Sequence, residues 1–307
     1  MIENVPSFLD LDGAAKTAFF SGWHELLEIL ADFDNASPDS EEDEKKQYYS
    51  ACSNELQSIL VLAAQACEIA LKARICKVSP YLLLIGSRNS LSTKSGTIDF
   101  SGLRTVDAVD LVGTVNTVTA KPVSDAFSNR FSELRKLRNK AMHLGQGNEQ
   151  ADPNEMFDLF EDLYVDLWPQ SSFLQDWKAF LEGTRRSYFH DYKWSSPEME
   201  IAEVLRTFYH KTNKSRYSSL FHVDKKQPRF TCLDCYFDGA IENTSIPIEE
   251  FQTAVLESRN RLLCFLCGGV SEVEEHECVD DVCSGKLVSG NSANYPGLCQ
   301  TCGYPQI

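Results

Sequence analysis

The sequence predicts a mainly helical chain that ends in a small, zinc-stabilised α+β domain. Apolar residues recur at helical spacing through most of the N-terminal part, which is typical of a helical bundle. Eight of the 11 cysteines fall between Cys232 and Cys302, in a segment with few apolar residues. We therefore expect a helical bundle over residues 1–183, a basic and aromatic helical connector over 184–229, and a cysteine-rich zinc-binding domain over 230–307.

Length and composition are compatible with a folded protein of two domains. The chain has 307 residues, of which 43% are hydrophobic and 11% are aromatic, so a core can form and wholesale disorder is not expected. The formal net charge of −16 argues against a surface that binds nucleic acid everywhere. It leaves room for a local basic site, because net charge does not describe the field in a cleft.

No targeting or membrane segment is expected. Acidic residues (Glu3, Asp10 and Asp12) stand where a secretory signal would carry Lys or Arg. The longest apolar run, around residues 59–67, is too short to span a bilayer. We therefore expect a soluble, cytoplasmic protein that makes no use of a membrane. In that compartment paired cysteines are more often metal ligands than disulfides.

The first helices follow from the spacing of apolar residues. Residues 14–33 predict a helix, and the acidic stretch 32–44, which contains Pro38, predicts an exposed loop. Residues 43–78 form the strongest helical pattern, with an apolar stripe so wide that this helix should lie at the centre of a bundle. Ser79-Pro80 ends it.

The next segments are less uniform. Residues 87–102 are rich in Ser, Gly and Thr and predict a loop. Residues 103–118 contain many β-branched residues, which favour a strand, but their apolar positions recur every three residues, and we favour a helix. Asp152 as N-cap and Pro153 at the first position mark a clear helix start. Further helices are expected over 124–144, 152–168, 172–181 and 196–210.

The connector is locally basic and aromatic. Residues 182–229 contain ten Lys and Arg against six Asp and Glu. Aromatic residues are interleaved with them: Tyr188, Phe189, Tyr192, Trp194, Tyr209 and Tyr217. This composition suits single-stranded RNA, because bases stack on aromatic rings and cations neutralise phosphates. An amphipathic connector that packs its aromatics on the bundle would show the same composition.

The C-terminal cysteines have the spacing of zinc ligands. They form four pairs: Cys232 and Cys235, Cys264 and Cys267, Cys278 and Cys283, and Cys299 and Cys302. A Cys-x-x-Cys turn presents two thiolates to one metal, and two turns complete a tetrahedral site. We expect two structural zinc ions, with the pairs combined in sequence order. Interleaved pairing, His276 in place of one thiolate, and redox or disulfide cysteines are the alternatives. Cys52, Cys67 and Cys76 are expected in the core.

Residues 131–143 carry the pattern that favours catalysis. Arg135, Lys136, Arg138 and Lys140 lie within six residues of an acidic chain, and His143 follows them. Histidine titrates in the range that proton transfer needs, and a guanidinium binds phosphate oxygens with two N–H groups. These residue types suffice for RNA cleavage by attack of its own 2′-hydroxyl, and no metal is required.

Arg138-Asn139 followed by His143 resembles the motif of the HEPN superfamily, in which a polar residue follows Arg and His comes after four to six intervening positions. The resemblance covers roughly residues 14–181. It implies a helical bundle that forms a homodimer, and an endoribonuclease that cuts tRNA, rRNA or mRNA in phage defence or as a toxin. An antitoxin or trigger protein is then an expected partner.

The resemblance also implies residue roles. Arg138 would stabilise the phosphate, His143 would act as acid or base, and Asn139 would orient the site. Arg135, Lys136 and Lys140 would bind the substrate. Glu68 either matches the acidic residue that some HEPN proteins place on an earlier helix or pairs with Lys72 one turn away.

Two other functions compete with this one. The bundle can be a non-catalytic HEPN-like dimer whose zinc domain serves as a protein or nucleic-acid adaptor. A zinc-dependent hydrolase or deaminase is less favoured, because no His-x-Glu or His-Glu-x-x-His stands beside the cysteines. Arg138 and His143 would lie about 140° apart on a regular helix, so they converge only if the helix ends between them or across a dimer.

Overall fold

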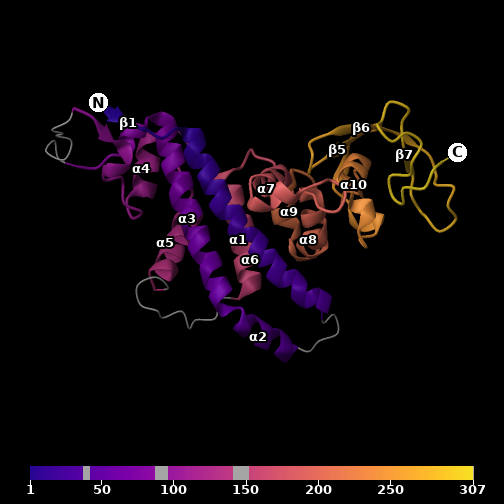
Figure 1. Cartoon of the computed structure of the whole chain (residues 1–307), viewed down its shortest axis with the longest axis horizontal. Coiled ribbons are helices and arrows are strands. Elements are labelled where there is room, and N and C mark those ends of the chain that lie inside the picture. The colour runs from indigo at the N-terminus through magenta and orange to yellow at the C-terminus, as the bar shows by residue number, and fades with distance from the viewer. Residues whose placement is uncertain (37–41, 87–95, 141–151, 307) are drawn as a thin grey trace. The chain divides into compact units, whose positions relative to one another are not determined.

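The computed structural model describes residues 1–36, 42–86, 96–140 and 152–306 (Figure 1). The chain divides into two compact units, Met1–Trp168 and Pro169–Ile307. This division falls before the sequence-based boundary at residue 183. Residues 169–183 and the connector, 184–229, therefore belong to the same unit as the cysteines. We describe each unit by itself.

The first unit is a helical bundle around two long helices. Its helices are α1 (Phe8–Ala36), α2 (Glu42–Ala51), α3 (Ser53–Val78), α4 (Leu111–Val118), α5 (Asp125–Asn139) and α6 (Pro153–Leu167). Helices α1 and α3 pack along one another (Figure 1). Helices α4 and α5 pack on α3, and α6 contacts both long helices. A short parallel pair, β1 (Ile2–Glu3) and β2 (Ile98–Asp99), lies beside them.

Aromatic side chains fill the interface between α1 and α6. Trp23 packs on Phe157 with ring centroids 5.1 Å apart, and Phe19 packs on Phe160 at the same distance. Gly22 allows this close approach, since a Cβ there would meet the Phe160 ring at 3.0 Å. These side chains are almost fully buried, so their burial supplies much of the apolar driving force for the bundle.

The predicted N-cap at Asp152 is present. Asp152 accepts a hydrogen bond from the backbone N–H of Asn154 at 2.8 Å, and Pro153 is the first residue of α6. Ser124 caps α5 and Ser196 caps α8 (Pro197–Lys211) by the same kind of bond. Each side-chain oxygen satisfies one backbone donor that the helix start leaves open. The starts of these helices were therefore readable from sequence.

Two helix predictions were wrong in part. The single helix expected over 43–78 is interrupted at Cys52, where polar α2 gives way to apolar α3. Within 103–118 only α4 is helical. The backbone N–H groups of Ile85 and Val106 pair with the carbonyls of Arg104 and Leu83, and this holds the start of the segment extended. Helices α1 and α2 also reach into both ends of the predicted 32–44 loop. Residues 87–95 of the loop predicted over 87–102 lie outside the described residues.

The second unit combines helices with a small sheet. Its helices are α7 (Phe173–Glu182), α8 (Pro197–Lys211), α9 (Lys214–Phe221) and α10 (Leu233–Asp238). Its strands form an antiparallel sheet in sequence order: β3 (Arg229–Phe230), β4 (Ala254–Ser258), β5 (Arg261–Cys264), β6 (Val270–Glu275) and β7 (Leu287–Ser289). The chain is thus mainly helical with a C-terminal sheet region that carries the cysteines, as predicted.

A row of aromatic rings joins the helices of the second unit to its cysteine-rich part. Phe208 of α8 packs on Phe173 at 5.6 Å and on Phe221 at 5.9 Å, and Phe221 packs on Phe265 at 5.1 Å. Phe265 lies between Cys264 and Cys267. Helices α8 and α9 therefore pack, through these rings, against the turn that carries Cys264 and Cys267. Within the described ranges, no helix has the length and hydrophobicity needed to cross a membrane.

Candidate functional site

The first cysteine tetrad joins α10 to the β5–β6 turn. Cys232 precedes α10 and Cys235 lies in its first turn, whereas Cys264 ends β5 and Cys267 follows in the turn. The Sγ atoms of Cys232 and Cys267 are 3.9 Å apart, and those of Cys235 and Cys264 are 3.8 Å apart. All four sulfurs lie within 4.8 Å of one another.

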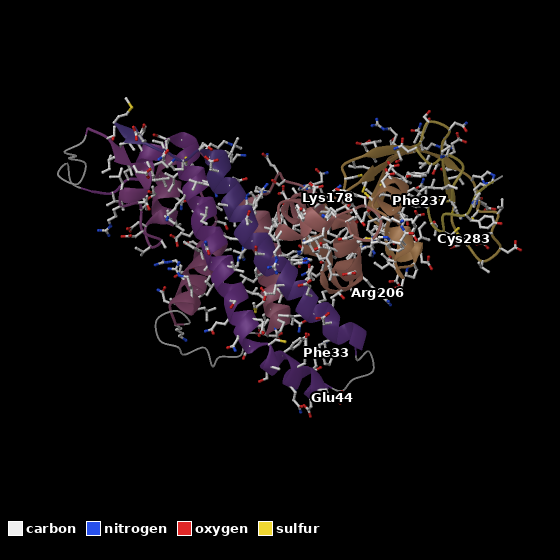
Figure 2. All side chains as sticks on the ribbon, viewed as in Figure 1. Phe33, Glu44, Lys178, Arg206, Phe237 and Cys283 are labelled. Carbon is white, nitrogen blue, oxygen red and sulfur yellow. The ribbon has the colours of Figure 1, made fainter. Side chains whose placement is uncertain are left out.

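The second tetrad closes the C-terminal loops. It consists of Cys278, Cys283, Cys299 and Cys302, whose sulfurs also lie within 4.8 Å of one another. The Sγ–Sγ distance is 3.6 Å between Cys278 and Cys302 and 3.9 Å between Cys283 and Cys299. Figure 2 labels Cys283 in the region between β6 and β7.

These distances fit zinc rather than disulfides. Four sulfurs bound to one ion at about 2.3 Å in a tetrahedron are about 3.8 Å apart. An S–S bond is only about 2.05 Å long, and all eight cysteines are free thiols. The two groups follow sequence order, which is the pairing that the spacing favoured. His276 belongs to neither group, and its side chain is exposed.

Backbone N–H groups point at the sulfurs in both tetrads. Gly269 donates to Cys267 and Gly285 donates to Cys283, each at 3.3 Å. Gly268 and Gly303 each follow the second cysteine of a turn with a φ of +71°, a conformation that favours glycine. Such N–H groups stabilise negative charge on sulfur, so the turns are built for thiolates.

Burial distinguishes the two tetrads. In the first, only Cys267 is exposed, whereas in the second only Cys299 is buried. With four thiolates, each site offers a metal no open position for a substrate, so a structural role fits both. The first should hold its ion behind a protein shell and the second in reach of solvent.

Lys178 is a charged residue near the first tetrad that sequence reasoning missed. Its Nζ lies 2.5 Å from Oε1 of the buried Glu198. Figure 2 labels Lys178 on α7. Burial lowers the pKa of Lys178, but its hydrogen bond with Glu198 and the negative charges of Glu198 and Cys235 outweigh burial and raise it. A cation therefore lies near the first tetrad, where bound zinc and four thiolates would carry excess negative charge. No local spacing links α7 to Cys235.

The remaining cysteines lie in the helical bundle. Cys67 and Cys76 of α3 are buried, and Cys52 is partly buried. Burial raises the pKa of the Cys67 thiol, which keeps it protonated and unreactive. Cys67 and Cys76 thus occupy core positions, as expected, and Cys52 lies at the edge of the core.

Arg138 lies near the end of α5, against α3. Its Nη1 donates to Oε2 of Glu68 at 3.0 Å, and Nζ of Lys72 donates to Oε1 of the same carboxylate at 2.9 Å. Glu68 therefore pairs with Lys72, which confirms one of the two sequence-based interpretations, and it also pairs with Arg138. The neighbouring Asn139 accepts a weaker bond from Arg138 Nη2 at 3.4 Å.

Two cations share one carboxylate in this Arg138 cluster, which we define as Glu68, Lys72 and Arg138. Burial raises the pKa of Glu68, but hydrogen bonds and charges from Lys72 and Arg138 outweigh burial and lower it. The carboxylate is thus ionised at neutral pH. It orients the guanidinium and leaves the cluster with an excess of positive charge, which suits a phosphate.

Arg130, eight residues earlier on α5, has a different environment. It pairs with Asp166 and lies 3.6 Å from Asp162, and both carboxylates belong to α6. Two anions neutralise one cation here, so Arg130 links α5 to α6 and is not available to a phosphate. The contrast between the two arginines could not be seen in their sequence context.

The other residues of the predicted site are placed in part. Lys136 pairs with Glu133 at 2.7 Å on the exposed side of α5, and Arg135 lies over the Phe131 ring at 5.8 Å. Lys140 is exposed at the end of the helix. His143 lies outside the described residues, so the proximity of Arg138 and His143 stays a prediction.

Fold and sites together define a mainly helical protein with two cysteine tetrads suited to structural metal ions. No protein family, curated protein or solved structure matches this chain.

Proposed function

We propose that this protein is a metal-independent endoribonuclease of the HEPN type, in which Arg138 and His143 act on an RNA phosphate. The main support is the Arg138 cluster: the arginine of the motif is oriented by Glu68, and the cluster keeps an excess of positive charge. Arg130, which lies on the same helix without the motif, is neutralised instead.

The chemistry needs few groups. The 2′-hydroxyl oxygen attacks the adjacent phosphorus, the bond to the 5′-oxygen breaks, and a 2′,3′-cyclic phosphate forms. One base removes the 2′-hydroxyl proton, and one acid supplies a proton to the leaving 5′-oxygen. In this proposal His143 carries those protons, Arg138 stabilises the charge on the phosphorane, and Asn139 orients the site. Arg135, Lys136 and Lys140 hold neighbouring phosphates.

A homodimer would supply the second histidine. In an isologous dimer both copies present the same surface, so two copies of His143 can divide the roles of acid and base. A function in phage defence or as a toxin, with an antitoxin or trigger protein as partner and a cytoplasmic location, belongs to the same proposal.

Cleavage of RNA by purified wild type, Arg138→Ala and His143→Ala tests the proposal, with EDTA added just before the assay. We expect wild type to leave 2′,3′-cyclic phosphate ends and each substitution to lower the rate by at least about 100-fold. Arg104→Ala is the matched control, because Arg104 is an exposed arginine of the same unit and pairs with the nearby Asp107. Equal cleavage by all four proteins would reject the site assignment.

The second candidate function is a non-catalytic adaptor. It is favoured by the tetrads themselves, since protein thiols fill every ligand position and leave the metal sites only a structural role. If wild type cuts none of a panel of tRNA, rRNA and mRNA substrates, this function takes the place of the nuclease.

A further inference from the structure

Four large aromatic side chains are exposed within one short segment of the second unit. Tyr188 and Phe189 belong to the 3₁₀ helix η5 (Arg185–Phe189), and Tyr192 and Trp194 follow it. Their exposed fractions are 86%, 73%, 51% and 68%, in chain order. We call residues 188–194 the aromatic loop. Rings this large are normally buried, so a cluster of them at the surface indicates a binding function.

The other aromatics of the basic connector behave differently. Tyr209 and Tyr217 are buried, and the guanidinium of Arg229 lies 4.0 Å from the centre of the Tyr209 ring. The Tyr209 hydroxyl donates to the carbonyl of Gln252 at 2.9 Å. Part of the connector is therefore core of the second unit, and the exposed rings of the connector lie in the aromatic loop.

The loop is ordered by the carboxylate of Asp191. This group accepts hydrogen bonds from the backbone N–H groups of Lys193 at 2.9 Å, Trp194 at 2.7 Å and Ser195 at 3.1 Å. These bonds hold the pKa of Asp191 below its usual range. Tyr192, between Asp191 and Lys193, has a φ of +53°, which is rare for a bulky residue. The hydrogen bonds around it maintain this conformation.

Two contacts fix the loop to the rest of the unit. The buried ring of His190 lies 3.0 Å from a carboxylate oxygen of Glu200 on α8. The side chain of Asn243 donates to the carbonyl of Lys193 at 3.3 Å. Because the loop is ordered before any ligand arrives, binding on its rings loses little conformational entropy.

The segment that carries the rings has a net positive charge, although the chain as a whole is acidic. Residues 185–194 of the sequence contain three cations (Arg185, Arg186 and Lys193) against one acidic residue, Asp191. The Nζ of Lys193 lies 5.4 Å from the centre of the Trp194 ring. The loop thus combines exposed aromatic rings with cations, which is the chemistry that single-stranded nucleic acid requires.

We propose that the aromatic loop binds single-stranded RNA, with bases stacked on its exposed rings and phosphates neutralised by Arg185 and Lys193. This inference deepens the proposed function, on which it rests for the class of ligand, because it states where the substrate is held. A duplex keeps its bases stacked on one another, so the loop selects unpaired RNA.

Binding is measured with the full-length protein and a fluorescent single-stranded 2′-O-methyl RNA of about 12 nucleotides, which has no free 2′-hydroxyl and cannot be cut by this chemistry. We expect Tyr188→Ala and Trp194→Ala each to weaken binding by about five- to a hundredfold, which is the effect of losing one stacked base. Plotted against log salt, log K has a negative slope, and Lys193→Gln should make that slope shallower by about 0.7, since one phosphate contact is lost.

Tyr81→Ala is the matched control, because Tyr81 is 56% exposed but lies in the other unit, and it should bind like wild type. Absence of wild-type binding at low salt would overturn the inference. So would Tyr188→Ala and Trp194→Ala proteins that bind the RNA as tightly as wild type. So would a change in oligomeric state of those variants without a change in RNA affinity, since the rings would then contact a second copy.

The two proposals fail in different ways. If wild type binds RNA through the aromatic loop but cuts none, the nuclease proposal is wrong and the RNA-binding role of the aromatic loop is retained. If cleavage requires Arg138 but RNA binding does not depend on the aromatic loop, only the RNA-binding role of the loop is wrong.

Discussion

Glu68 accepts hydrogen bonds from two cations, and this makes its charge important for stability as well as for the orientation of Arg138. The pKa of Glu68 lies below its ordinary value of 4.5. A carboxylate whose folded pKa is lowered stabilises the fold above its unfolded pKa, and this contribution is lost as pH falls through the folded pKa. At neutral pH the contribution is fully present.

We therefore expect Glu68→Gln to lower the free energy of unfolding at pH 7 by about 1–2 kcal/mol, because two partly buried cations lose their shared anion. The loss should shrink towards zero in acid, well below the ordinary pKa, where the wild-type carboxyl is also neutral. Denaturant unfolding of both proteins at the two pH values measures this difference. Any loss of metal in acid affects both proteins alike.

Glu133→Gln is the control for that comparison. Glu133 pairs with Lys136 at 2.7 Å, but both side chains are largely exposed, so its loss should change stability very little. A destabilisation by Glu68→Gln that is equal at both pH values would show that ionisation of this carboxyl is not its cause.

At the scale of elements, the close contact of α1 with α6 depends on Gly22, which has no side chain. An added Cβ at Gly22 would lie 3.0 Å from the ring of Phe160, 3.4 Å from the Ile59 carbonyl oxygen and 3.4 Å from Leu62 Cβ. Phe160 is fully buried and cannot move away easily. Gly13 lies on the same helix with nothing within 4 Å of such a Cβ.

We expect Gly13→Ala to stabilise the protein by about 0.4–1 kcal/mol, because alanine loses less backbone entropy in a helix. Gly22→Ala should instead destabilise it by about 1–2 kcal/mol, since overpacking exceeds that gain. Thermal unfolding followed by circular dichroism compares the two variants. A Gly22→Ala protein as stable as Gly13→Ala would show that α1 and α6 can move apart at no cost.

At the scale of the whole molecule, we expect the cysteine tetrads to make folding of the second unit depend on metal. A structural zinc site contributes on the order of 10–16 kcal/mol, and few buried apolar residues surround the second tetrad. We expect two zinc ions per chain, one for each tetrad, by elemental analysis. Chelation should release the ion of the less buried second tetrad first and that of the first tetrad later.

Cysteine variants assign those two steps. Cys283→Ser should abolish the zinc that chelation releases first, and Cys235→Ser the zinc that it releases later. Cys52→Ser, outside both tetrads, should leave the zinc content unchanged. Circular dichroism should show that α1 to α6 persist after chelation, because they contain no tetrad ligand. Release of both ions in one step would mean that the difference in burial does not make one tetrad lose its zinc before the other.

Much of this organisation was readable from sequence because it is local. Helix caps such as Asp152, the apolar stripe of α3 and the Cys-x-x-Cys turns depend on residues a few positions apart, and spacing alone specifies them. The same holds for the order of the tetrads, since short connections favour neighbouring pairs. The segment around residues 103–106 was mispredicted because a backbone partner at Leu83, distant in sequence, holds it extended.

The sequence by itself determined the mainly helical character, the cysteine ligand sets and the candidate motif around Arg138. Only the tertiary structure decided which charges meet: Arg130 with two carboxylates of α6, Arg138 with Glu68, and Lys178 with the buried Glu198. It also decided which aromatics are exposed. The physical reason is that ion pairs and burial depend on the packing of elements far apart in the chain, and no local pattern records that packing.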